Sequence, residues 1–143
     1  MRVPENVKSA YVAALKYRRV AFGTCSMAGV PNTVPIGVGR FLDDETLIVV
    51  YNYFLKTRKN IEENPHATVS FWVSEEKDGR VITKEGYQMK GRVMIQKNGQ
   101  LYDQMKSEMK AIRADFPVKA IVLMKVEEIY DVRAGPGAGR RLA

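Results

Sequence analysis

The strongest constraint on the fold is a series of short β-forming segments separated by turn residues. Five segments are rich in β-branched, aromatic or aliphatic side chains: residues 20–26, 47–52, 67–73, 87–96 and 118–133. Turn signals lie between them, for example at Met27-Ala28-Gly29 and at Asp78-Gly79. Because strands joined by tight turns pair as antiparallel neighbours, the pattern predicts a mainly β chain whose sheet closes into a barrel.

Residues 31–40, PNTVPIGVGR, are the least regular of the β-forming stretches. They contain two prolines and two glycines within a loosely alternating pattern. Proline has no N–H for a strand ladder, so we expect this strand at a sheet edge, at a bulge, or facing something other than protein. An acidic hairpin turn is expected at residues 41–46. The run LIVVYN (47–52) is continuously apolar, which is typical of a strand buried on both faces.

Three segments show helical periodicity and are expected to cover the ends of the barrel. The first spans residues 4–18 and is expected to begin just after Pro4. The second is short and lies within residues 54–65, where Thr57 or a nearby residue can begin it. The third, residues 99–117, is amphipathic. Its apolar stripe is formed by Leu101, Met105, Met109 and Ile112.

The chain length of 143 residues predicts a single domain, with residues 134–143 as a possible flexible, Gly-rich tail. The single cysteine excludes an internal disulfide and fits a reducing compartment. No apolar run approaches the ~20 residues of a membrane-spanning helix. The first ten residues lack the character of a signal peptide. We therefore expect a cytoplasmic protein with no membrane partner.

A formal net charge of +7 raises the question of nucleic-acid binding. The basic residues, however, are spread over the whole chain and interleaved with acidic ones such as Glu62 and Glu75. A nucleic-acid interface instead needs basic residues gathered on one face. The charge therefore favours solubility and attraction to small anions such as phosphates, and nucleic acid is not an expected partner.

Common catalytic and metal-binding sets are absent from the sequence. His66 and Cys25 are the only residues of their types, and we expect a structural or solvated imidazole and a buried, inert thiol. Glu62 and Glu63 are adjacent, so their side chains diverge and form no acid–base pair. The tail sequence GPGAGRR resembles a dinucleotide-binding loop, but no helix follows it. We expect no metal site and assign no catalytic residue.

The most informative segment is LIVVYNYFLKTRKNIEENP, residues 47–65. A buried strand leads into Lys56 and Thr57 at the start of a short helix. The first turn of a helix has unpaired N–H groups and a partial positive charge, so a Lys ammonium and a Thr hydroxyl there suit a phosphate monoester. On local features alone, a solvated lysine with Thr57 as an N-cap explains the pattern equally well.

Two further segments extend the pattern on either side of this element. PNTVPIG (31–37) precedes it by about one hairpin, and GYQMKGRVMI (86–95) follows it. In this order and spacing, over about residues 15–130, the chain resembles the pyridoxamine 5′-phosphate oxidase-like family. Within that family it is similar to the short FMN-binding proteins of anaerobic bacteria and archaea.

The resemblance implies a six-stranded antiparallel split β-barrel and a homodimer with FMN in clefts at its interface. Lys56 and Thr57 would bind the phosphate, and Gln88 would be a polar contact near the phosphate or the ribityl hydroxyls. Partner-chain groups near Pro136 would cap the ring. The ribityl chain and the ring would be lined by residues of two strands: Thr33, Val34, Pro35 and Ile36, and then Val50, Tyr51 and Asn52.

The same resemblance implies a redox function through flavin N5, as a reductase, an oxidase or an electron carrier, with a small-molecule or protein redox partner. The alternative is a protein that stores flavin or pyridoxal phosphate without turnover. Authentic pyridoxamine phosphate oxidases have a Trp in an Arg-rich C-terminal segment, whereas this chain ends in AGPGAGRRLA and its only Trp is Trp72. Synthesis of pyridoxal phosphate is therefore not expected.

Overall fold

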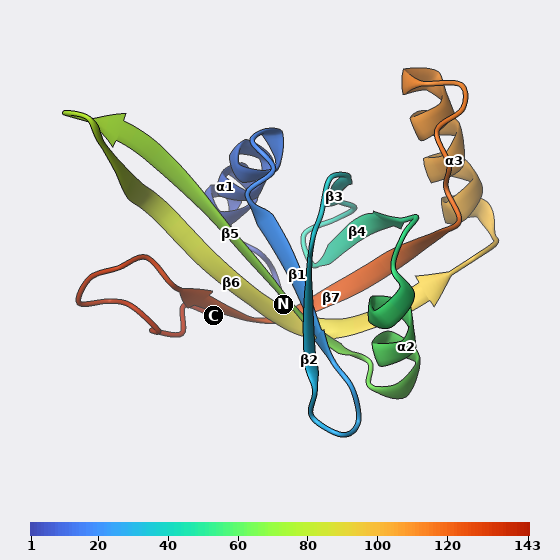
Figure 1. Cartoon of the computed structure of the whole chain (residues 1–143), viewed down its shortest axis with the longest axis horizontal. Coiled ribbons are helices and arrows are strands. Elements are labelled where there is room, and N and C mark those ends of the chain that lie inside the picture. The colour runs from blue at the N-terminus through green and yellow to red at the C-terminus, as the bar shows by residue number, and fades with distance from the viewer.

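A computed structural model describes residues 1–143 as one curled β-sheet with three helices (Figure 1). The seven strands are β1 (Val20–Cys25), β2 (Pro31–Pro35), β3 (Gly39–Phe41), β4 (Thr46–Tyr51), β5 (His66–Lys77), β6 (Arg80–Gln96) and β7 (Ala120–Asp131). The helices are α1 (Glu5–Lys16), α2 (Leu55–Glu63) and α3 (Gln100–Ile112).

All strand pairs are antiparallel, and the sheet order is β2-β1-β5-β6-β7-β4-β3. The expectation of a mainly β split barrel with small flanking helices is confirmed. The polar stretch at residues 74–86 extends β5 and β6 into a long hairpin that projects from the body (Figure 1). Its turn is at Asp78-Gly79, where both residues have positive φ.

The sheet has seven strands where the resemblance implied six, because residues 31–40 do not form one strand. They divide into β2 and β3, which lie at opposite edges of the sheet. Between them, Ile36 donates its N–H to Val20 of β1, and Val38 accepts from the N–H of Val50 in β4. This crossing segment therefore brings the two edges together, and the prolines of β2 lie at an edge, where no ladder bond is lost.

Two apolar clusters stabilise the fold from opposite faces of β4 and β7. A cluster of 23 buried residues includes the inward face of α1 and fills the curled sheet, with Tyr11, Phe22 and Phe71 at its centre. A smaller cluster joins Ile48 and Ile121 of the sheet to Met105 and Met109 of α3. Five of the six residues of β4 are buried, as its continuously apolar sequence predicted.

The amphipathic helix is shorter than predicted, and one of its stripe residues is not buried. Helix α3 ends at Ile112, because Arg113 has an extended backbone and donates its N–H to Met109. Ile112 is 75% exposed, since the sheet lies beneath the earlier turns only. The prediction that Ile112 belongs to the buried stripe was wrong.

The C-terminal residues fold back along the second half of β7, beyond its pairing with β4. Asp131 donates its N–H to Arg140, and Leu142 donates to Ile129, at 2.9 and 2.7 Å. Tyr130 and Arg141 form an isolated bridge. The tail therefore covers a stretch of sheet edge, while its flexibility stays a prediction. None of the three helices combines the length and the apolar character that crossing a bilayer requires.

Candidate functional site

The inward face of β2 carries the first part of the candidate site. Burial alternates along this strand, so Asn32 and Val34 are half-buried whereas Pro31, Thr33 and Pro35 are exposed. Side chains of a strand alternate between its two faces, and Asn32 and Val34 therefore face the same side.

Helix α2 meets this face of β2 through a single side-chain hydrogen bond. The Asn32 amide nitrogen donates to Thr57 Oγ1 at 3.1 Å. Thr57 is only 1% exposed, and the N-cap position of α2 belongs to Phe54. The alternative in which Thr57 caps the helix is therefore wrong, because its side chain instead holds Asn32 in place.

A basic pocket of about 450 Å³ lies between one side of α2, from Lys56 to Glu63, and the β1–β2 turn. Lys56 and Lys59 line it together with Asn32, Asn60 and Glu63. Neither lysine has an ion-pair partner. The first turn of α2 contains no acidic residue and no side-chain cap, so its terminal N–H dipoles add to the positive potential. Glu63 opposes this charge, although its carboxylate accepts a 3.4 Å bond from Met27 N–H.

An apolar pocket of about 380 Å³ follows farther along the same strand. It has no carboxylate, imidazole or ammonium in its wall. The lining residues are Val34, Pro35, Ile36, Gly37, Val38, Val50, Asn52, Tyr53 and Phe54. Phe54 is held in place by stacking on Phe22, with ring centroids 6.1 Å apart. Such a surface suits a flat, weakly polar ring system.

Asn52 is the main side-chain amide in the apolar pocket, and its orientation is fixed. Its Oδ1 accepts a hydrogen bond from the backbone N–H of Lys119 at 3.2 Å, which leaves the amide NH₂ as a free donor. The wall formed by residues 52–54 is thereby attached to the start of β7. The pocket combines an apolar surface with a single oriented polar group, as small-molecule sites commonly do.

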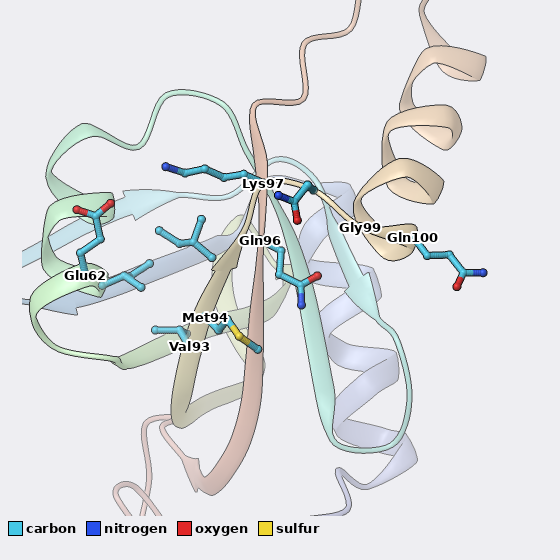
Figure 2. A pocket seen from close by; sticks show the side chains of 10 residues that line it. Glu62, Val93, Met94, Gln96, Lys97, Gly99 and Gln100 are labelled. Carbon is cyan, nitrogen blue, oxygen red and sulfur yellow. The ribbon is translucent and has the colours of Figure 1, made fainter.

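The largest cavity, of about 890 Å³, is a separate groove between α2 and the β6–α3 connection. Figure 2 shows its wall, in which Glu62 comes from α2, Gln96 ends β6 and Lys97 follows that strand. Gln100 points away from the other side chains (Figure 2). None of the residues predicted for the cofactor lines this groove, and its side chains form no concentrated charge.

Comparison with known proteins decides the family. The model of the pyridoxamine 5′-phosphate oxidase family matches residues 7–133. The chain belongs to this family. An uncharacterized protein of Methanocaldococcus jannaschii, MJ0282, is 34% identical over an alignment of 134 residues that covers 92% of this chain and 85% of that protein.

Solved structures show the same fold. HupZ of Group A Streptococcus has 27% identity and a TM-score of 0.70, over 96% of this chain and 99% of that one. An FMN-binding protein from Syntrophomonas wolfei has 16% identity and a TM-score of 0.72, over 91% of this chain and 88% of that one. Two further structures resemble the chain in fold alone. An F420 reductase has 16% identity and a TM-score of 0.60, over 89% of this chain and 98% of that one. The heme storage protein HutZ from Vibrio cholerae has 14% identity and a TM-score of 0.61, over 92% of this chain and 95% of that one.

The structure brings together most of the residues that the family resemblance implied. Five of them line the apolar pocket: Val34, Pro35, Ile36, Val50 and Asn52. Lys56 lines the basic pocket, and Thr57 lies enclosed beside it. Tyr51 is 6% exposed and packs its ring edge against Phe54, 5.3 Å between centroids, so it supports the wall from behind.

Thr33 and Gln88 do not join the others. Thr33 is on the outward face of β2, where it lines another pocket of about 490 Å³ that also contains Cys25 and His66. Gln88 lies in β6 between Ser70 of β5 and Tyr130 of β7, and lines none of the pockets described. Within one protomer, both residues therefore lie away from the basic and apolar pockets.

The outward pocket has its own electrostatic feature. Glu128 lies on its wall and accepts a hydrogen bond from the Tyr130 hydroxyl. That bond lowers the pKa of Glu128 and raises the pKa of Tyr130. The Lys90 ammonium also lies over the Tyr130 ring, 4.8 Å from its centroid. The wall of the outward pocket therefore carries both the Glu128 carboxylate and the Lys90 ammonium.

Sequence reasoning missed four residues of the inward site: Asn32, Lys59, Tyr53 and Phe54. A signal existed for Lys59, which follows Lys56 by three residues and therefore lies on the same side of a helix. Asn32 belongs to the PNTVPIG motif but has no polar partner nearby in sequence. Its role depends on a contact with Thr57, 25 residues away.

Proposed function

We propose that this chain is an FMN-binding redox protein, with the cofactor lying along the inward face of β2. One observation carries the proposal: a basic pocket and an uncharged apolar pocket adjoin the same strand, joined by Asn32 and Val34. From Pro31 to Ile36 a strand advances about 16 Å, at about 3.3 Å per residue. That separation suits an extended molecule with a phosphate at one end and a ring at the other.

The basic pocket fits the phosphate. The ammonium groups of Lys56 and Lys59 form no ion pair, and charge-assisted hydrogen bonds to phosphate oxygens are stronger than neutral ones. Asn32, held by Thr57, would orient the phosphate rather than neutralise it. In this proposal Thr57 acts through Asn32, since its own side chain is enclosed.

The apolar pocket fits the ring. Val34, Ile36 and Val50 provide flat aliphatic contacts, and the free NH₂ of Asn52 can donate to a ring carbonyl oxygen. When bound, FMN supplies hydride or single-electron transfer at its N5 atom. The chain's own residues then bind the cofactor, orient it and exclude water from one side of the ring, which requires no nucleophile from the protein.

We also propose that two copies of the chain form a homodimer around the cofactor. Thr33 and Gln88 lie on outward surfaces, away from the pockets of their own chain. They would contact a cofactor only if it were bound by a second copy of the chain across an interface. The polar outward wall near Lys90 and Tyr130 supplies further groups for such an interface. Sedimentation velocity should show a species of twice the 16.2 kDa chain mass.

A Lys56→Ala substitution tests the phosphate site. The loss of a charged hydrogen-bond donor should weaken FMN binding by roughly 1.5–3 kcal/mol, measured by quenching of flavin fluorescence during titration. Lys110→Ala, on an exposed turn of α3, removes the same charge away from the site and should leave the Kd unchanged. Equal FMN affinity in the two variants would remove Lys56 from the site.

A second candidate is storage of a cofactor without turnover, as the name of HutZ states for heme in that protein. The absence of carboxylate, imidazole and ammonium groups from the apolar pocket favours it. Purified protein that is yellow and is bleached by NADH or NADPH, then reoxidised by an acceptor, would support the redox function. Yellow protein that no donor reduces would support storage.

A further inference from the structure

A cationic recess of about 340 Å³ adjoins the apolar pocket, because residues 52–54 line both. Its remaining wall comes from the first turn of α2, the residue after β6 and the start of β7. The lining residues are Tyr51, Asn52, Tyr53, Phe54, Leu55, Arg58, Lys97, Lys119 and Ala120. Three of these are cationic and none is acidic. The volume is in the range of about 300–1,000 Å³ that is typical of small-molecule sites.

The positive charge of the cationic recess is largely uncompensated. Lys97 and Lys119 form no ion pair with an acidic residue. Arg58 is paired with Glu62, but its Nε lies 3.8 Å from Oε1 and both side chains are about half exposed. Exposed pairs of this kind contribute little free energy, so Arg58 can turn to a stronger anion.

The cationic recess also presents an unusually open aromatic ring. Tyr53 is 80% exposed, and the Lys119 ammonium lies 5.9 Å from the centroid of its ring. Leu55, beside it, is 77% exposed. The bond from Lys119 N–H to Asn52 Oδ1 holds the two walls together. A flat ring can therefore stack on Tyr53 while an attached anion meets the cations.

We propose that the cationic recess binds a nucleotide, which consists of a planar base and a phosphate. This nucleotide would be part of the molecule that donates electrons to the redox protein proposed above. The phosphate would lie against Lys97, Lys119 and Arg58, and the base on Tyr53. The identification as part of an electron donor rests on the proposed function, because it depends on the wall shared with the pocket assigned to the flavin ring. The binding of a nucleotide follows from the charges and the open ring alone.

Calorimetric titration of the protein at saturating FMN tests this site, with AMP as the probe. Adenosine and inorganic phosphate separate the contribution of the base from that of the charge. We expect AMP to bind at least about tenfold more tightly than either, and higher salt to weaken it. Lys119→Ala and Lys97→Ala should each weaken AMP binding about tenfold. Lys110→Ala should not, and FMN affinity should be equal in all variants.

Several outcomes would overturn the inference. One is an AMP affinity that is equal in the Lys119→Ala, Lys97→Ala and Lys110→Ala proteins. Release of FMN by AMP would place the nucleotide in the basic pocket instead, and inorganic phosphate binding as tightly as AMP would exclude a role for the base. If the unaltered protein fails to bind FMN, the proposed function fails, whereas AMP titration of that protein still tests the recess.

Discussion

At the scale of single residues, Tyr11 has a buried hydroxyl that its surroundings do not satisfy. The side chain is 0% exposed, packs edge-on against Phe41 and Phe71, and its oxygen has no hydrogen-bond partner. Tyr11→Phe should therefore raise the free energy of unfolding by about 1 kcal/mol, measured by urea denaturation. Tyr17→Phe, at a residue that is 62% exposed, should change it little. A less stable Tyr11→Phe protein would show that the hydroxyl is satisfied in solution.

The same residue predicts a pH dependence. Burial raises the pKa of Tyr11 well above its usual value, because the phenolate is poorly solvated in the core. The unfolded chain then loses its Tyr11 proton first, so stability should fall as the pH rises above about 10. This alkaline loss should be smaller in Tyr11→Phe. An identical alkaline decline in both proteins would mean that other groups cause it.

Residue-scale prediction from the sequence was best where the structure is local. Lys56 lies in the first turn of a short helix that follows a buried strand, as the sequence predicted, while its role in binding phosphate stays a prediction. The hydrogen bond of Asn32 to Thr57 joins residues far apart in the chain, so no local pattern reports it. The outward orientation of Thr33 depends on where β2 begins and ends. The irregular order of prolines and glycines in residues 31–40 does not predict those strand boundaries.

At the scale of elements, the sharpest feature is the close approach of β6 and β7 at Gly91. The strand register shifts between Lys90 and Gly91, and a Cβ at Gly91 would lie 1.9 Å from the carbonyl oxygen of Lys125. Gly91→Ala should therefore destabilise the protein by roughly 3 kcal/mol, since backbone atoms must move. Gly137→Ala serves as the control, because a Cβ at Gly137 would contact only Asp131 Oδ2, at an ordinary distance of 3.7 Å. Equal urea midpoints for the two variants would contradict the tight packing.

Elements with a single strong pattern were predicted well, and those with a mixed pattern were not. The continuously apolar β4 follows from the sequence, and the bulge of β6 lies at Gly91, where a glycine within a strand pattern is typical of one. Residues 31–40 were expected as one strand, because nothing in their order shows that the chain crosses from one sheet edge to the other there. That crossing is set by two backbone hydrogen bonds, from Ile36 to Val20 of β1 and from Val50 of β4 to Val38. Both partners belong to other strands, so the order of residues 31–40 does not reveal them.

At the scale of the whole molecule, alternate residues of β4 and β7 pack into two separate apolar clusters, one on each face of these strands. Helix α3 lies at the far side from α1 (Figure 1) and is attached through the smaller apolar cluster and an ion pair between Arg40 and Glu108 at 3.1 Å. None of its residues lines the basic or the apolar pocket. Packing of α3 and cofactor binding should therefore be separable except through Val38 and Val50, which pack in that cluster and also line the apolar pocket.

Met105→Ala tests this separation, because Met105 is 1% exposed and lies at the centre of the α3 contact. Loss of its buried side chain should lower the free energy of unfolding by roughly 2–5 kcal/mol, measured by urea denaturation. Ile112→Ala on the same helix should have little effect, since that side chain is largely exposed. The FMN Kd of the folded Met105→Ala protein should equal that of the unaltered chain. A weakened Kd would mean that α3 supports Val50, which packs in the same apolar cluster as Met105 and also lines the apolar pocket.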